Sequence, residues 1–274
     1  MNWKLWRTQV AAILALELKR SLFSRRSIVL YLLAAMPFSI FALHAAAVAI
    51  GYTGCRGDKD LMIFAGVFQL FTLRLVVFFG CVAVFMNLFR GEVMEKSMHY
   101  LFLAPVRREV LVAGKYLAGL ITTAVVFGLS TVASYAVTVR HLEGTSTRAL
   151  AAEAWGHMAA YAGVTLLACA GYGAVFLILG LLFRNPVIPT AAVLLWESFI
   201  VFMPAFLKKA SVIFYLESLC PVRVPFDGAG AIFAISADPA PVWLALPGLL
   251  VLTAIVIWAA AARIRRMEIR YGAE

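Results

Sequence analysis

The sequence predicts an all-α integral membrane protein with six transmembrane helices. Three observations support this fold class: the composition, six long apolar runs and an uneven distribution of charge. Hydrophobic residues make up 64% of the 274 residues and charged residues only 14%, and the mean hydropathy is +0.93. A soluble fold of this length cannot bury so much apolar surface, and disordered chains are poor in apolar residues. The composition therefore excludes soluble enzymes and disordered proteins.

The six apolar runs are each long enough to cross a membrane as a helix. A crossing helix needs about 20 apolar residues. The runs are continuous, whereas the strands of a membrane barrel alternate apolar and polar residues. We expect one transmembrane domain over residues 1–274. Its predicted spans are residues 28–50, 70–89, 117–139, 158–183, 187–207 and 242–262.

The charged residues predict the orientation of these spans. Six crossings place both termini on one side, together with the loop after the second span. That side collects 16 basic and 6 acidic residues, and the other side holds 7 of each. Basic loops stay in the cytoplasm, so we expect a multi-pass protein of the plasma (inner) membrane with both termini cytoplasmic. The net charge of +10 is then an orientation signal and not a nucleic-acid surface.

Residues 1–26 predict a helix that lies along the membrane interface. Its apolar face carries Trp3, Trp6 and Ile13, and its lysines lie mostly opposite, as in interfacial amphipathic helices. Glu17 intrudes on the apolar face. The alternative is a plain helical extension of the first span.

The cytoplasmic loop after the second span contains a second predicted helix, over residues 91–104. Glu92 and Glu95 suit the positive end of a helix dipole, and Met98, Leu101 and Phe102 recur at helical spacing. Pro105 ends this helix. An exposed apolar stripe of this kind indicates docking into the groove of a partner.

At this point the sequence resembles the ABC transporter permeases of the type-2 exporter class. The matching residues are Gly91-Glu92, Glu95, Leu101, Pro105, Arg107-Arg108 and Gly114-Lys115, with Glu17-Leu18-Lys19-Arg20 resembling the opening motif of the family. Where the family commonly has Gly-Thr, this chain has Ser97-Met98.

The resemblance implies a permease subunit that pairs with a second permease subunit, identical or different, and with separate ATP-binding subunits. Residues 91–104 would be the coupling helix, and ATP and Mg²⁺ would be bound by the partner ATPase. Its implied ATPase contacts are Glu92, Glu95, Met98, Leu101, Phe102, Pro105, Arg107 and Arg108. The lipid bilayer is the remaining partner, and the substrate is not predicted.

The residues themselves predict no catalytic, cofactor or metal site in this chain. A phosphate loop needs a glycine five residues before its Gly-Lys pair, but Glu109 stands there before Gly114-Lys115. The four histidines form no hydrolase or zinc motif. A structural membrane subunit of a larger complex and a secondary transporter remain as alternative functions.

Two ionisable residues lie inside predicted spans. Glu197 is central in the fifth span and Arg74 lies in the outer part of the second. Charges at this depth are costly unless paired, protonated or hydrated. Three alternatives follow: a Glu197–Arg74 pair, a protonated Glu197 bonded to a neighbouring hydroxyl or carbonyl with Arg74 reaching outward, or a substrate contact.

The outer part of the chain carries a predicted gate segment. Pro204 is expected to kink or end the fifth span, and residues 208–241 contain an apolar stretch before Pro221. Such a segment resembles the outer helices that the family places before its last span, and an ordinary amphipathic loop is the alternative. Cys55 and Cys220 are the two cysteines expected outside the bilayer, where an oxidising environment favours a disulfide between them. The alternatives are two unrelated thiols and a bridge between two copies of the chain.

Overall fold

The apolar runs of the sequence form long helices. The computed structural model describes residues 3–24, 27–52, 57–94, 107–140, 148–183, 185, 187–222, 224 and 240–265, and every regular element in these ranges is helical. Within these ranges, five helices are long and apolar enough to cross a membrane: Ser27–Ala49, Asp60–Phe89, Arg108–Arg140, Ala154–Leu182 and Val242–Arg265. The predicted all-α membrane fold is confirmed, with five helices of crossing length.

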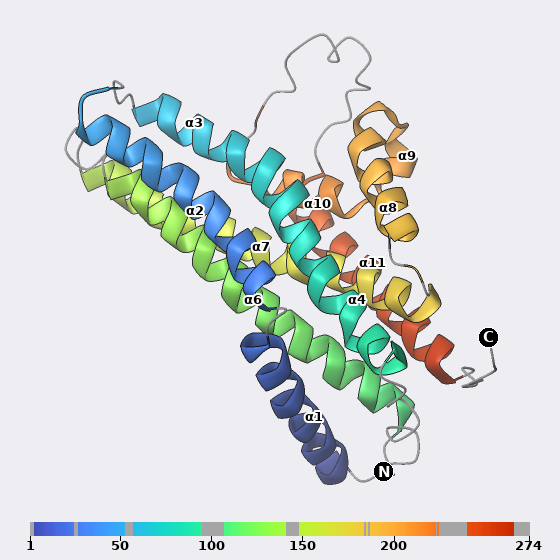
Figure 1. The fold of residues 1–274 in the computed structure, drawn as a ribbon. Helices are drawn as coiled ribbons and strands as arrows, with labels where there is room; N and C mark the ends of the chain where they lie inside the picture. Colours follow the sequence, from blue (N-terminus) through green and yellow to red (C-terminus); the bar gives the residue numbers. More distant parts are fainter. Residues whose placement is uncertain are drawn as a thin grey trace.

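The first two helices follow one another beside a third, longer helix. α1 (Trp3–Phe23) and α2 (Ser27–Ala49) both lie along α6 (Arg108–Arg140) (Figure 1). Ile13 of α1 faces Gly114 near the start of α6, and Ser130 further along α6 donates a hydrogen bond to the Ala34 carbonyl of α2. Both helices therefore run parallel to α6, and α1 is a helix of its own.

The second predicted span is longer than its apolar run and changes its winding in the middle. It consists of α3 (Gly57–Val67), the π-helix η1 (Phe68–Val77) and α4 (Phe78–Met94). The hydropathy pattern predicted residues 70–89 and no change of winding.

The third and fourth spans also begin earlier than predicted. α6 begins at Arg108 and α7 (Arg148–Leu182) at Arg148, where the apolar runs begin at residues 117 and 158. At 1.5 Å per residue each helix is about 50 Å long, well beyond the roughly 30 Å hydrocarbon core. Both helices are therefore longer than a single crossing requires.

The fifth predicted span, residues 187–207, is wrong as a single crossing helix. α8 (Val187–Phe199) continues only as the short 3-10 turn η2 (Ile200–Phe202), and the backbone is then extended at Met203, with φ −91° and ψ 153°. The cause is Pro204, because the residue before a proline avoids the helical conformation. Val187–Phe202 is apolar but spans only about 24 Å at 1.5 Å per residue.

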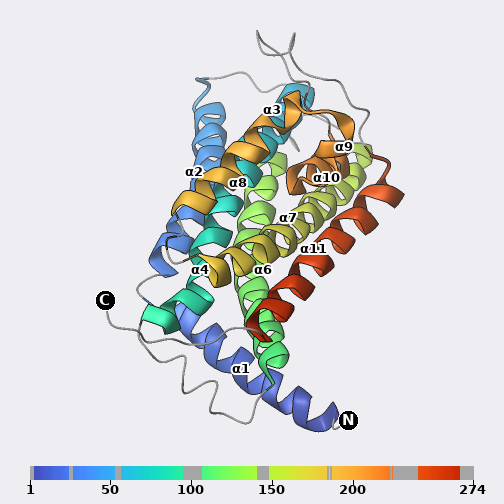
Figure 2. The same ribbon diagram turned by 90° about the vertical axis from the view of Figure 1, so that its right-hand side faces the viewer.

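The chain after α8 forms two short helices and a last long one. α9 (Ala205–Lys208) and α10 (Val212–Leu219) precede α11 (Val242–Arg265). Figures 1 and 2 place α9 and α10 towards the end of the molecule opposite to α1, whereas α11 runs back towards the α1 end. Part of the predicted gate segment, residues 208–241, therefore consists of α10, and residues 225–239 lie outside the described residues.

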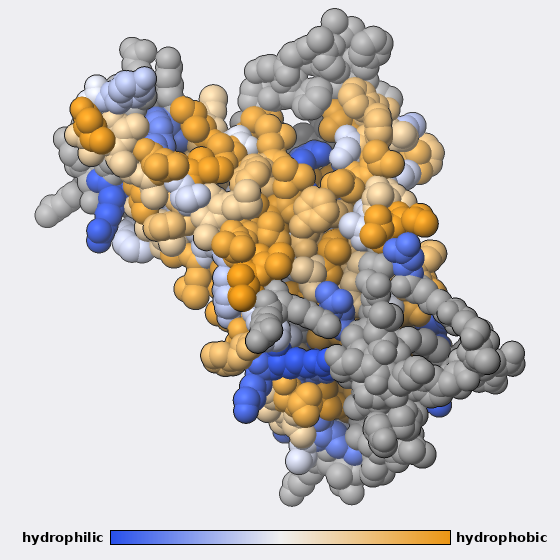
Figure 3. All heavy atoms as spheres, in the orientation of Figure 1, coloured by the Kyte–Doolittle hydropathy of each residue, from blue (hydrophilic) through white to orange (hydrophobic). Residues whose placement is uncertain are grey.

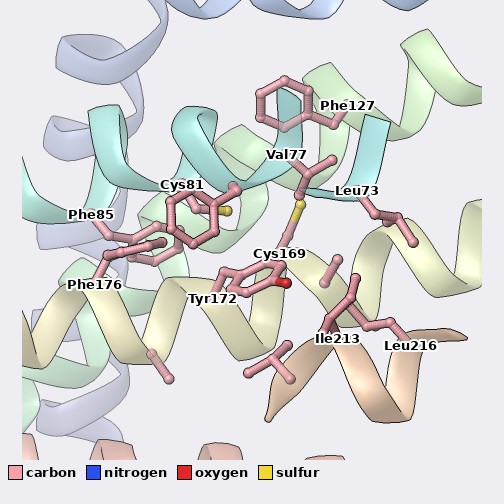
Figure 4. Close-up of a cluster of buried hydrophobic side chains, with 14 of the residues drawn as sticks. Leu73, Val77, Cys81, Phe85, Phe127, Cys169, Tyr172, Phe176, Ile213 and Leu216 are labelled. Carbon is pink, nitrogen blue, oxygen red and sulfur yellow. The ribbon is translucent and has the colours of Figure 1, made fainter. Parts of the chain in front are cut away.

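The core lies between α4, α6 and α7 and is rich in aromatic residues. Phe85 of α4 is fully buried between two glycines: a Cβ added at Gly119 of α6 or at Gly173 of α7 would lie 2.7 or 2.4 Å from its ring. Figure 4 shows Phe85 beside Phe176, with Cys81 and Tyr172 in the same cluster. Only glycine lets the three helices approach Phe85 this closely.

The surface is apolar over much of its area. In Figure 3 hydrophobic residues cover the middle of the visible face, and hydrophilic residues gather around the α1 end and in smaller patches elsewhere. α2 and α11 expose large apolar side chains, among them Leu43 and Trp258. An apolar surface of this size suits a lipid environment.

Candidate functional site

A buried ion pair holds α1 against α6. Lys115 Nζ donates to Glu17 Oε1 at 2.5 Å and to the Leu88 carbonyl of α4 at 2.8 Å. Lys115 is 0% and Glu17 3% exposed, and the ammonium also lies over the Phe89 ring. One lysine thus joins α1, α4 and α6, and we call Glu17, Lys115 and the Leu88 carbonyl the α1–α6 joint.

The start of α6 is also bonded to the end of α11. Arg108 Nη1 donates to the carbonyls of Ile264 and Arg265, at 3.2 and 3.1 Å. Arg265 Nε in turn lies 2.5 Å from Glu109 Oε1. The last carbonyls of a helix have no partner within the helix and attract cations, so Arg108 caps α11. These contacts place the start of α6 and the end of α11 at the α1 end of the molecule.

The residues predicted to contact an ATPase fall partly within this region. Arg107 and Arg108 are described, and the Arg107 guanidinium lies 5.1 Å from the centre of the Trp6 ring of α1. Residues 91–94 of the predicted coupling helix, including Glu92, belong to α4. Glu95, Met98, Leu101, Phe102 and Pro105 lie outside the described residues. Their contact with an ATPase stays a prediction.

A second polar cluster holds α10 near the opposite end of the molecule. Arg74 Nη2 of η1 forms an ion pair with Glu217 Oε1 of α10 at 2.6 Å, and Arg74 Nη1 donates to the Glu197 main-chain carbonyl at 3.3 Å. The suggested Glu197–Arg74 ion pair is therefore wrong. The carboxylate that binds Arg74 belongs to Glu217. The Arg74 guanidinium is held by Glu217 and by this carbonyl.

The Glu197 carboxylate instead caps the N-terminus of α10. Its oxygens accept hydrogen bonds from the Ser211 hydroxyl at 2.6 Å and from the backbone N–H groups of Val212 and Ile213, both at 3.1 Å. The first N–H groups of a helix lack partners within the helix, and a carboxylate suits its positive end. Of the sequence alternatives, the hydroxyl contact is present, and the substrate contact stays a prediction. We call Arg74, Glu197, Ser211 and Glu217 the α10 clasp.

The π-helix explains how two side chains from one face of η1 bind the segment around α10. In an α-helix residues five apart point about 140° away from each other. In a π-helix each backbone bond spans five residues, so residues five apart lie nearly above one another. Gln69 and Arg74 are five apart within η1, and Gln69 Nε2 donates to the Val222 carbonyl beyond α10 at 2.7 Å. Gln69 and Arg74 therefore both bind the segment that contains α10.

Glu217, Ser211 and Gln69 were not predicted from the sequence. The signal available was a single carboxylate inside the apolar stretch of residues 212–219, since an acidic residue in such surroundings requires a partner. Among the described residues, no group of three or more His, Cys, Asp or Glu side chains could hold a metal ion.

Cys220 follows α10 directly. Its thiol is free and buried, and burial, with a smaller contribution from Glu217, raises its pKa to about 12. Its suggested disulfide partner, Cys55, lies outside the described residues, so the Cys55–Cys220 pairing stays a prediction.

The helices and the two polar clusters define a multi-pass helical membrane protein. In comparison with known families, the chain matches the ABC-2 family transporter proteins over residues 61–260, which run from α3 into α11. The chain belongs to this family and is a permease of the ABC transporter class, as the sequence resemblance indicated. The search of curated proteins found no match.

Proposed function

We propose that this permease is the membrane-spanning subunit of an ATP-driven exporter. It would couple ATP hydrolysis in a separate ATP-binding subunit to the export of a substrate or to a mechanical signal. Membership of the ABC-2 family supports the permease role. ATP and Mg²⁺ would be held by the partner, since the Gly-Lys pair of this chain lies within α6 and Lys115 is bound to Glu17.

The observation that carries this proposal is the set of hydrogen bonds at the start of α6, next to the predicted coupling segment. α4 ends at Met94, within that segment, and α6 begins at Arg108, just after it. Within two turns of its start, α6 is bonded to α1 and α4 through Lys115 and to α11 through Arg108. Coupling travels through packed, hydrogen-bonded elements. A push on residues 91–104 would therefore move the ends of four helices together.

The far end of the molecule offers the element that such a movement would release. α10 is short and is held by the α10 clasp to η1 and α8. We infer that α8 and η2 act as a short fifth crossing, with residues 208–241 as the outer gate. Both ends of the chain would then lie in the cytoplasm of a cell with this protein in its plasma (inner) membrane.

A second permease subunit, identical or different, would complete the pathway. α2 and α8 expose large apolar side chains, including Leu32, Leu43 and Leu195. Surfaces of this kind contact lipid or another membrane helix, which is consistent with a paired permease.

Co-purification with the ATP-binding subunit tests the coupling proposal. Met98→Asp combined with Leu101→Asp places two charges on the predicted apolar stripe and is expected to abolish recovery of the ATPase while membrane insertion is retained. The matched control, Met98→Leu with Leu101→Met, keeps the stripe apolar and is expected to recover the ATPase normally. Unchanged recovery with the aspartate variant would refute the coupling-helix assignment. A native chain that recovers no ATPase would favour a structural subunit or a secondary transporter.

A further inference from the structure

The second span is one unbroken helix whose winding changes twice. α3 passes into η1 at Val67 and η1 passes into α4 at Phe78, and the backbone at both residues is right-handed helical, with φ −63° and ψ −39° at Val67 and φ −56° and ψ −59° at Phe78. Figure 1 shows α3 and α4 in line. π-helices are rare, mostly single turns, and frequent at functional sites. The π-helix of 10 residues in this span therefore requires a cause in its surroundings.

Two pairs of residues five positions apart show the effect of this winding on the faces of η1. Leu70 and Leu75 are both exposed, at 55% and 40%. Gln69 and Arg74, the residue before each of them, both bind the segment that contains α10. In an α-helix, residues five apart point about 140° away from each other. The π-winding therefore keeps both polar side chains on one face and both leucines on another.

The contacts with the segment around α10 supply the cause of the π-winding. Arg74 Nη2 lies 2.6 Å from Glu217 Oε1, near the end of α10, and Gln69 Nε2 donates at 2.7 Å to the Val222 carbonyl just beyond it. An unfavourable backbone conformation persists only where its surroundings fix it. If residues 69–74 wound as an α-helix, the two side chains would diverge and one of these contacts would be lost. The winding of η1 and its hold on residues 212–222 therefore depend on each other.

The other end of the same helix belongs to the α1–α6 joint. The Leu88 carbonyl of α4 accepts a hydrogen bond from Lys115, and α4 ends at Met94, within the predicted coupling segment. A displacement of α4 would therefore reach η1 along one continuous helix. Closely packed elements respond to such a displacement by changing between discrete arrangements and not by bending continuously. In η1 the two arrangements are the π-helix and the α-helix.

We propose that η1 is a two-state element that holds and releases the segment around α10. In the π state Gln69 and Arg74 share a face and hold residues 212–222. In the α state the two side chains diverge, one contact breaks, and the second span no longer holds this segment at both points. The part of this release in opening the outer gate rests on the proposed function. The link between winding and hold is a property of the permease alone.

Paired histidines measure the winding, because both must lie on one helix face to bind zinc together. Leu70→His with Leu75→His places two histidines five residues apart in η1, and zinc is expected to raise the melting temperature of this full-chain variant in detergent. The controls use exposed positions of α11. Leu250→His with Ile255→His has the same spacing in an α-helix and is expected to respond no more than the native chain. Val251→His with Ile255→His, four apart, is expected to respond.

The dependence of the winding on the α10 segment is tested in the Leu70→His, Leu75→His variant. Adding Glu217→Leu is expected to weaken zinc binding about tenfold, and adding Gln69→Leu about fivefold, because each change removes one hydrogen bond that favours the π state. Glu109→Gln, which alters the ion pair with Arg265 at the other end of the molecule, is the control and is expected to leave binding within about twofold. Since coupling is reciprocal, zinc should also slow hydrogen exchange at the amides of α10, measured by mass spectrometry.

Three results would overturn the proposal. If the histidine pair in η1 responds to zinc no more than the five-apart pair in α11, η1 does not wind as a π-helix in the permease. Unchanged zinc affinity after both Glu217→Leu and Gln69→Leu would mean that the α10 segment does not favour the π state. Zinc binding that leaves hydrogen exchange at α10 unchanged would mean that the winding does not hold α10. All of these measurements use the permease without an ATP-binding subunit, so their failure is distinct from a failure of the proposed coupling.

Discussion

Lys115 of α6 and Glu17 of α1 form an ion pair that is almost completely removed from solvent, with Nζ and Oε1 2.5 Å apart. Two charges lose their hydration when they are buried together, and their attraction compensates only while both are present. The Leu88 carbonyl satisfies a further hydrogen of the ammonium. The position of α1 on α6 therefore depends on both residues.

We expect Lys115→Met to destabilise the permease by about 3–5 kcal/mol, because it leaves the Glu17 carboxylate buried without its cation. Thermal unfolding of the protein in detergent, followed by tryptophan fluorescence, measures the effect. Combining Lys115→Met with Glu17→Leu is expected to recover most of the loss, since no charge then stays buried. Lys19→Met, on the exposed side of α1, is the control. A single variant as stable as the native protein would contradict the buried pair.

Glu197→Ala is expected to loosen α10, because it removes the acceptor for two backbone N–H groups and the Ser211 hydroxyl. Losing an N-terminal cap costs about 0.5–2 kcal/mol. Hydrogen exchange measured by mass spectrometry should therefore be faster at the amides of Val212 and Ile213. Ser198→Ala is the matched control, since the Ser198 hydroxyl donates to the Leu194 carbonyl of its own helix. Equal exchange in Glu197→Ala and native protein would mean that the cap contributes nothing to α10.

Two glycines of α7 should respond oppositely to alanine. Gly173→Ala places a methyl group against the Phe85 ring, and Phe85 cannot withdraw because Gly119 lies on its other side. Overpacking of this kind costs about 1–3 kcal/mol. A Cβ at Gly163 meets no atom within 4 Å, so Gly163→Ala should be neutral or stabilise the helix by up to about 1 kcal/mol. Melting temperatures in one detergent compare the two, and an equal loss in both variants would contradict the close packing at Phe85.

The sequence predicts those parts of the fold that depend on local composition. Long apolar runs indicate α2, α6, α7 and α11, because a crossing helix satisfies its own backbone. Pro204 was expected to kink or end the fifth span, and the extended backbone at Met203, the residue before it, agrees with that expectation. The π-helix carries no such local signal. Its effect, a common face for Gln69 and Arg74, arises from packing against the segment around α10.

The polar contacts show the same limit at single residues. The sequence identifies Glu17, Arg74 and Glu197 as charges in apolar surroundings, and such charges need partners. It does not specify which partners, because Lys115 and Glu217 lie 98 and 143 positions away from the residues they bind. The packing of the helices decides which residues meet when they are this far apart in the sequence. A helix that is longer or shorter than predicted therefore changes which side chains form these pairs.

Cys220 provides a test of the structure around α10 through its chemistry. Burial, with a contribution from Glu217, raises the pKa of its thiol to about 12, and only the thiolate reacts. At pH 8 about one molecule in ten thousand would carry a thiolate, and at pH 9 about one in a thousand, following the tenfold change per pH unit. We therefore expect N-ethylmaleimide to leave Cys220 unlabelled in the native protein at both values of pH, and to label it within minutes after denaturation in detergent. Peptide mapping by mass spectrometry measures both.

The free thiol of the structure predicts that this label appears without any reductant. Rapid labelling of the native protein would contradict the burial of Cys220. A linked Cys55–Cys220 peptide from unreduced protein would instead support the disulfide suggested by the sequence, and α10 would then be held from its C-terminal end by a covalent bond as well as by the α10 clasp.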